Sequence, residues 1–325
     1  MALLDAAMWA AFIILSKRAL RFVEPVAFNL LIRLLALVTF VVIGLPLALT
    51  HASSLDFALT WPALGYMALS ATIVWLVAFN AYFAALRIGA VSVISPVSST
   101  DPLFTAVFSF LLLGTALGPP IIAGLVLTMV GVVLIARWYT PEDAEEPAGV
   151  ETVLPSVPPS AVAGGDGRWA RLQTRWRSFE VVGLSLITAA TWGFAPILIQ
   201  SAVDSVGHAS LSLLMLSQGI GAVILAPLVL ARRRPLFTRR PTRAERRGLI
   251  LACVTCGIIE AVFSIAFYML IDQVGAVLTQ IAVAMAPVFT LLAGVVLLRE
   301  RPGWKVVGAA VLTVAGVLLA SVGAS

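Results

Sequence analysis

Charged residues are scarce in this chain. Asp, Glu, Lys and Arg make up 11% of its 325 residues, whereas a soluble domain carries about a quarter. Apolar residues make up 61%, and the mean hydropathy is +1.05. This composition excludes a sizeable soluble domain and predicts an integral membrane protein.

Residues that bind metals or carry out redox chemistry are equally rare. The chain has two histidines, His51 and His208, and both fall between apolar segments. Its two cysteines, Cys253 and Cys256, have a redox-like spacing but lie inside an apolar segment with no second pair. No Gly-rich loop ending in Lys-Ser/Thr is present. We therefore expect no metal, no cofactor and no enzymatic activity, because a membrane enzyme needs such groups clustered at one depth.

Most of the chain consists of long apolar segments. A helix of about 20 apolar residues is long enough to cross a bilayer. Ten segments qualify: 2–20, 26–49, 62–86, 90–113, 119–136, 180–200, 209–231, 248–271, 275–298 and 303–322. Residues 137–179 are rich in proline and charge, and we predict a disordered linker there. The predicted fold is an all-α membrane protein of ten transmembrane helices.

The two halves of the chain repeat each other. Identical residues recur at an offset of 185 positions at Pro102/Pro287, Thr105/Thr290, Thr128/Thr313 and Gly131/Gly316. We predict one five-helix repeat over 1–136 and a second over 180–325. A duplicated membrane bundle is typical of transporters, since a substrate site can form between halves that move against each other.

Basic residues are distributed unevenly between the connectors. Of the 21 Lys and Arg residues, 20 lie in the connectors that follow the odd-numbered spans, and the remaining one, Arg33, lies within the second span. By the positive-inside rule, those connectors are cytoplasmic and both termini face outward. This distribution explains the pI near 9.8 without nucleic-acid binding. Because each repeat has five helices, the two repeats must be inverted relative to each other.

Several motifs resemble the drug/metabolite transporter superfamily, in its EamA-type members with two five-helix repeats. They are Trp9, Arg33, Trp192-Gly193, and the segment from Leu298-Arg299-Glu300-Arg301-Pro302 to Gly316. The first repeat departs from the pattern, with Thr115 in place of Glu300 and Ala10 in place of Gly193. The resemblance implies a secondary transporter of the plasma membrane that exports amino acids, metabolites or drugs.

Two acids lie within predicted spans, where ionisable groups usually face a cavity. Asp101 lies on one helical face with Ser95, Ser98, Thr105 and Ser109, just before Pro102, where we expect a kink. That face is either a substrate or ion site or a hydrogen-bonded helix seam.

Glu260 has Trp75 as its counterpart in the first repeat. We interpret it as the group that carries a proton during transport, because no basic residue lies in its own span. The alternative is a structural partner for Arg33.

Other polar and aromatic residues within the spans complete the predicted cavity. Arg33 is an anion site or a partner for one of the acids. The remaining candidates are Trp9, Trp192, Asn80, Gln218, Gln280 and Tyr268.

The leading hypothesis is an exporter of a small solute that acts by alternating access, with proton coupling, as a monomer or homodimer in the lipid bilayer. The alternative is a lipid flippase or scramblase with a groove open to the bilayer.

Overall fold

The computed structural model describes residues 2–44, 46, 59–113, 118–138, 167–208, 211–231, 236–283, 290, 295–296 and 302–322. Across these residues the regular elements are helices, apart from one antiparallel bridge between Val23 and Phe237. The α-helices are α1 (Ala2–Ala19), α2 (Pro25–Thr39), α4 (Trp61–Ala71), α5 (Phe79–Ile88), α6 (Val91–Ser98), α7 (Asp101–Leu113), α8 (Pro119–Trp138), α10 (Gly167–Val206), α11 (Leu211–Ala231), α12 (Arg243–Val283) and α14 (Trp304–Val322). Two π-helical segments, η1 (Phe40–Gly44) and η2 (Thr72–Ala78), continue α2 and join α4 to α5.

Within the described residues, six helices are long and apolar enough to cross a membrane: Pro25–Val42, Trp61–Ile88, Pro119–Trp138, Ser178–Val206, Leu211–Ala231 and Glu245–Ala276. They correspond to the second, third, fifth, sixth, seventh and eighth predicted spans. Helices α1 and α14 match the first and tenth. Half of the ninth predicted span, 275–298, lies outside the described residues, as does the segment Leu298–Arg301.

Residue choice at the helix ends explains where several helices begin. Thr60 caps α4, its hydroxyl accepting the backbone N–H of Ala63 at 3.3 Å. Thr242 and Glu245 form a reciprocal capping box at the start of α12. Within α12, Gly275 has a φ of +81°, which glycine adopts without steric cost. The chain therefore changes direction at Gly275, where the sequence predicts a connector.

The fourth predicted span is not one continuous helix. Helix α6 ends at Ser98, Ser99 and Thr100 form a turn, and α7 starts at Asp101. The expected kink is therefore a break placed just before Pro102, which has no N–H to donate and fits the first turn of a helix. The break puts Asp101 at the beginning of a helix, whereas the sequence pattern predicted a mid-helix position.

The predicted linker 137–179 is wrong at its C-terminal end. Helix α10 begins at Gly167, well before the predicted span at 180. The segment 167–179 has four Arg and two Trp and contains no proline, so no proline interrupts the helix. Residues 139–166 of the linker lie outside the described residues.

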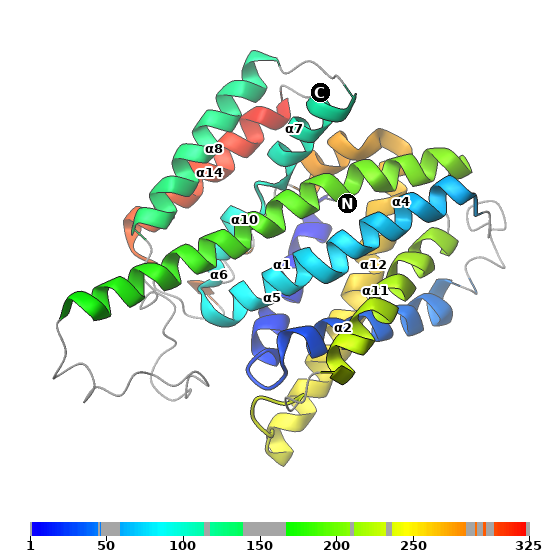
Figure 1. The fold of residues 1–325 in the computed structure, drawn as a ribbon, viewed down its shortest axis with the longest axis horizontal. Helices are drawn as coiled ribbons and strands as arrows, with labels where there is room; N and C mark the ends of the chain where they lie inside the picture. The colour runs from blue at the N-terminus through cyan, green and yellow to red at the C-terminus, as the bar shows by residue number, and fades with distance from the viewer. Residues whose placement is uncertain are drawn as a thin grey trace.

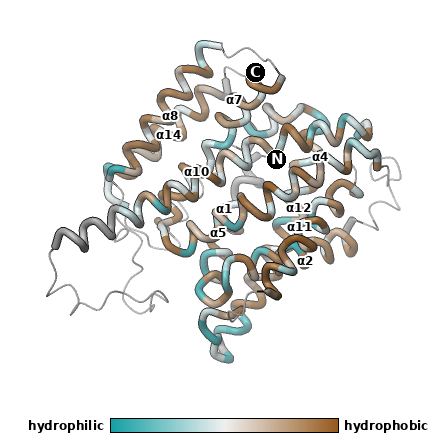
Figure 2. Tube along the Cα trace, in the orientation of Figure 1, coloured by the Kyte–Doolittle hydropathy of each residue, from teal (hydrophilic) through white to brown (hydrophobic). Residues whose placement is uncertain are grey.

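Helices α8 and α14 form a separate layer beside the main bundle, at the upper left of Figure 1. Gly124 packs against Gly316 and Ala320, and Gly131 against Thr313 and Ala309. The two helices are therefore antiparallel and pack closely through small residues, as is common between membrane helices. Hydrophobic residues predominate along these and the other helices in Figure 2.

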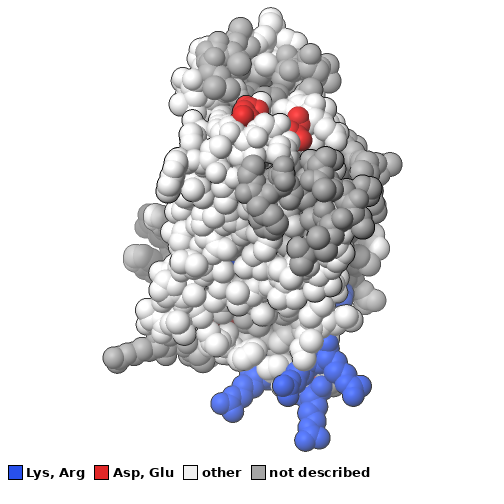
Figure 3. Space-filling model, turned by 90° about the vertical axis from the view of Figure 1, so that its right-hand side faces the viewer, with Lys and Arg blue, Asp and Glu red and all other residues white. Residues whose placement is uncertain are grey.

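The connector between α1 and α2 lies beside the connector before α12. Phe22 and Thr238 share a backbone hydrogen bond of 2.8 Å, Glu24 and Leu236 one of 3.1 Å, and Val23 bridges Phe237. The end of α5, where the third predicted connector begins, joins them, because Arg87 donates to the Thr238 hydroxyl at 3.3 Å. Three connectors predicted to be on one side of the membrane thus meet. Figure 3 shows Lys and Arg gathered at one end of the face it displays, with Asp and Glu near the other end.

Candidate functional site: a cavity at the centre of the bundle

A cavity of about 130 Å³ lies inside the helix bundle. Its walls come from α1, α4, η2, α5, α7, α10, α11 and α12, whereas α8 and α14 contribute no lining residue. The lining residues are Trp9, Ser70, Val74, Trp75, Phe79, Ser99, Asp101, Trp192, Ala195, Pro196, Ile199, Leu214, Ser217, Gln218, Glu260, Phe263, Ser264, Phe267, Tyr268 and Gln280. Both predicted repeats therefore supply walls.

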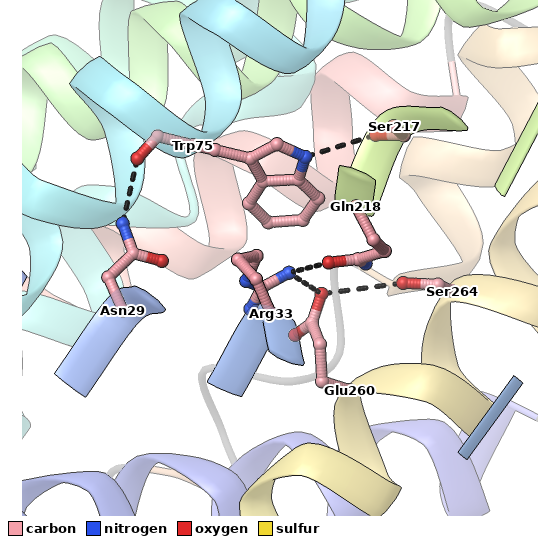
Figure 4. Close-up of polar contacts among 7 residues, drawn as sticks. All are labelled: Asn29, Arg33, Trp75, Ser217, Gln218, Glu260 and Ser264. Carbon is pink, nitrogen blue, oxygen red and sulfur yellow. Dashed lines mark hydrogen bonds and ion pairs between the residues drawn. The ribbon is translucent and has the colours of Figure 1, made fainter. Parts of the chain in front are cut away.

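A buried ion pair lies at one wall of this cavity. Arg33 Nη1 donates to Glu260 Oε1 at 2.9 Å and to Gln218 Oε1 at 2.7 Å, and the three side chains come from α2, α12 and α11 (Figure 4). Arg33 and Glu260 are both buried. Because a charge in a low-dielectric interior is costly without a partner, each of the two ions depends on the other.

Trp75 covers the guanidinium of Arg33. The Arg33 Cζ atom lies 3.8 Å from the centre of the Trp75 ring, a cation–π contact. The indole Nε1 of Trp75 donates to Ser217 Oγ at 3.0 Å, and Ser264 Oγ donates to Glu260 Oε1 at 3.3 Å (Figure 4). Arg33 itself is therefore not a lining residue.

Asn80 and Asn29 support the segment that carries Trp75. Asn29 Nδ2 donates to the Trp75 carbonyl at 2.7 Å, and Asn80 Nδ2 donates to the Leu76 carbonyl at 2.8 Å. Both carbonyls belong to η2, whose wider π-helical turns leave backbone oxygens available to side chains. Asn80 is not among the described lining residues of this cavity; its side chain binds a backbone carbonyl of η2.

Asp101 reaches the cavity from the start of α7. Its carboxyl group is hydrogen-bonded by the side-chain amide of Gln280, and Gln280 Nε2 also donates to the Trp192 carbonyl at 3.3 Å. Among the described residues, no basic side chain pairs with Asp101. Asp101 and Glu260 therefore lie in different settings, one hydrogen-bonded by an amide and the other paired with an arginine.

Aromatic rings form much of the remaining wall. The rings of Trp9 and Trp192 meet edge to face with centroids 5.4 Å apart. Trp9 also lies 5.3 Å from Phe263, and Trp192 lies 5.4 Å from Phe79. The two tryptophans, which occupy equivalent places in the two repeats, thus touch each other at the cavity.

Gly193 allows α10 to approach α7 beside the cavity. A Cβ atom at Gly193 would lie 2.5 Å from both the Asp101 carbonyl oxygen and Phe104 Cβ. Thr105 Oγ1 donates to the Gly193 carbonyl at 2.8 Å across this contact.

Replacing Gly193 by alanine is therefore expected to lower stability by about 1–3 kcal/mol through overpacking and to displace Asp101. The measurement is the melting temperature in detergent. Gly183→Ala on the same helix is the matched control, because a Cβ there meets nothing within 4 Å. Equal melting temperatures for the two variants would contradict the close contact.

Seven of the nine predicted site residues line the cavity: Asp101, Glu260, Trp9, Trp192, Gln218, Gln280 and Tyr268. Arg33 lies behind it, paired with Glu260, and Asn80 lies outside it. Sequence reasoning missed Trp75, Phe79, Phe263, Ser217 and Ser264 as wall residues. Helical spacing could have identified two of them, since Ser264 lies one turn after Glu260 and Phe79 lies one turn after Trp75.

Comparison with known proteins agrees with this architecture. The model of the EamA-like transporter family matches residues 1–137 and 180–322, so the resemblance proposed from the sequence is confirmed. One crystal structure of a protein has a TM-score of 0.58 to this chain at 16% identity, covering 99% of this chain and 97% of the other, which shows a shared fold. A search of the curated proteins found no match.

Proposed function

We propose that this chain, which belongs to the EamA-like transporter family, is a secondary transporter that exports a small metabolite, amino acid or drug-like solute by alternating access. Members of this family are membrane transporters and not enzymes, and the apolar helices make this chain a multi-pass membrane protein. We place it in the plasma membrane. The family match gives no support to the lipid flippase alternative.

The observation that carries the proposal is a cavity with a buried polar cluster between the two repeats. Trp75 and Asp101 from the first repeat face Glu260 and Gln280 from the second. Polar groups are costly at membrane depth, and they are usually found where a substrate or ion passes. We expect the chain to act as a monomer or a homodimer, with the described lining residues supplied by one chain.

Ten spans in two inverted repeats, 1–136 and 180–325 joined by 137–179, fit this proposal. Thr128 and Thr313 are equivalent residues, and Thr128 Oγ1 approaches the Thr313 carbonyl at 3.4 Å between the antiparallel helices α8 and α14. Arg33 and Gln218 are also separated by 185 positions and bond directly. Antiparallel packing of equivalent helices is expected when the repeats have opposite orientations in the membrane.

We assign proton coupling to Asp101. The sequence favoured Glu260, because no basic residue lies in its own span, but Arg33 reaches it from another helix. Arg33 offsets the charge of Glu260, whereas no basic side chain among the described residues pairs with the Asp101 carboxyl group. Asp101 is therefore better placed to take up and release a proton.

Asp101→Asn is expected to abolish pH-gradient-driven transport in proteoliposomes, because the amide keeps the shape and removes the titrating group. The solute comes from a growth-protection screen over amino acids, nucleobases and drugs. The matched control is Asp204→Asn at an exposed position of α10, which should keep gradient-driven transport. Gradient-driven transport that is unchanged in Asp101→Asn would show that Asp101 is not the coupling group.

The proposed topology places both termini outside and residues 232–247 in the cytoplasm. In a background lacking Cys253 and Cys256, a cysteine in 236–242 should resist an impermeant thiol reagent in intact cells. A cysteine in 200–208 should react with it. The reverse pattern of labelling would overturn the assigned orientation.

A further inference from the structure

We propose that the cavity binds a small organic cation, an ammonium group on a compact apolar body, with Asp101 as its counter-ion. This inference rests on the transport function proposed above and names the substrate class of the same cavity.

The charges of the cavity wall favour a cation. Two carboxyl groups, Asp101 and Glu260, line the cavity, and no lysine, arginine or histidine is among the lining residues that the structure describes. Arg33 offsets the charge of Glu260 from behind Trp75. Asp101 is therefore the one acid of the described wall without a cationic partner, and an anionic solute would be repelled there.

The aromatic residues of the wall favour the same solute. Seven of the twenty lining residues are aromatic: Trp9, Trp75, Phe79, Trp192, Phe263, Phe267 and Tyr268. A ring face carries negative potential and attracts a cation, most strongly for tryptophan. Trp9 and Trp192 line the same cavity as Asp101. A solute in this cavity would thus meet indole rings as well as the Asp101 carboxyl group.

The size of the cavity limits the solute. Its volume is about 130 Å³, and an apolar cavity of about 150 Å³ accommodates benzene. A solute with a single ring and a short substituent is therefore close to the largest that the cavity can hold in this conformation. Benzylammonium, benzyl alcohol and benzoate are suitable probes, because they have similar shapes and carry charges of opposite sign or none.

Equilibrium binding of these three probes to the purified full-length protein tests the inference. We expect benzylammonium to bind at least roughly tenfold more tightly than benzyl alcohol, as a charge-assisted contact contributes, and benzoate to bind least. Equal or tighter binding of benzyl alcohol or benzoate, or no binding of benzylammonium at millimolar concentration, would overturn the proposal. This comparison uses the wild-type protein and does not depend on any variant folding.

Variants then locate the counter-ion. Asp101→Asn should weaken benzylammonium binding by roughly 10- to 100-fold and leave benzyl alcohol binding unchanged, whereas Asp101→Glu should retain most of the preference for the cation. Asp204→Asn removes the same charge at an exposed position of α10 and should have no effect. An Asp101→Asn protein that keeps the full preference would show that Asp101 is not the counter-ion.

Flux measured in proteoliposomes separates this inference from the transport function. Binding of benzylammonium without flux of any probe would support the cation site and count against transport. Flux of benzoate or benzyl alcohol in preference to benzylammonium would support transport and overturn the cation site.

Discussion

Arg33→Met is expected to destabilise the protein by about 3–5 kcal/mol, because it leaves the Glu260 carboxylate buried without its cation. It also removes the donor to Gln218 and the guanidinium under Trp75. The measurement is thermal unfolding in detergent. Arg247→Met, at an exposed position early in α12, is the control and should melt like the wild type.

A double-mutant cycle shows whether the loss comes from the pair. Arg33→Met with Glu260→Gln removes both charges, so the double variant should be more stable than Arg33→Met alone. Strict additivity of the two single effects would mean that the ions do not depend on each other. The stability lost in Arg33→Met would then come from lost packing of the Arg33 side chain against Trp75.

A disulfide between residues 23 and 237 is expected to stop transport almost completely. Val23 and Phe237 are opposed in an antiparallel bridge, and such pairs lie within reach of a disulfide. The bridge joins connectors from the two repeats on the side where basic residues gather. If the repeats move apart there to open the cavity, a covalent link will hold that side closed.

The experiment uses Val23→Cys and Phe237→Cys in a background lacking Cys253 and Cys256. Transport of the solute identified by growth protection should fall on oxidation and recover on reduction. Each single cysteine variant is the control and should be insensitive to oxidation. Full transport by the cross-linked protein would show that these connectors do not separate.

Composition and repetition were sufficient to predict the fold class. Apolar length located the six continuous spans found among the described residues. The offset of 185 pairs Thr128 with Thr313, and these two residues are in contact between α8 and α14. What the sequence could not predict was how the helices depart from regular geometry. The π-helical turns of η2 are held by tertiary contacts such as the Asn29 bond to the Trp75 carbonyl, which no local pattern encodes. Pro102 predicted a kink, but not that α6 and α7 would be separate helices.

For the candidate site, too, the sequence predicted individual residues but not how distant residues pair. Polar and aromatic side chains in apolar spans predicted seven of the twenty described lining residues, because polar groups at membrane depth usually face a cavity. The pairing of Arg33 with Glu260 brings together residues 227 positions apart, so the sequence could offer it only as an alternative. Trp75 was overlooked as a wall residue because an apolar residue in an apolar span is no exception to the pattern.

The central claim is that the cavity opens alternately to the two sides of the membrane. Ser99 lines the cavity at the break between α6 and α7, and Ser99→Cys makes it reactive toward a small impermeant thiol reagent. In vesicles, this cysteine should react from either side when residues 23 and 237 are free. After they are cross-linked, it should react only from the side opposite their connectors. Labelling from both sides of the cross-linked protein, or only ever from one side of the free protein, would contradict alternating access.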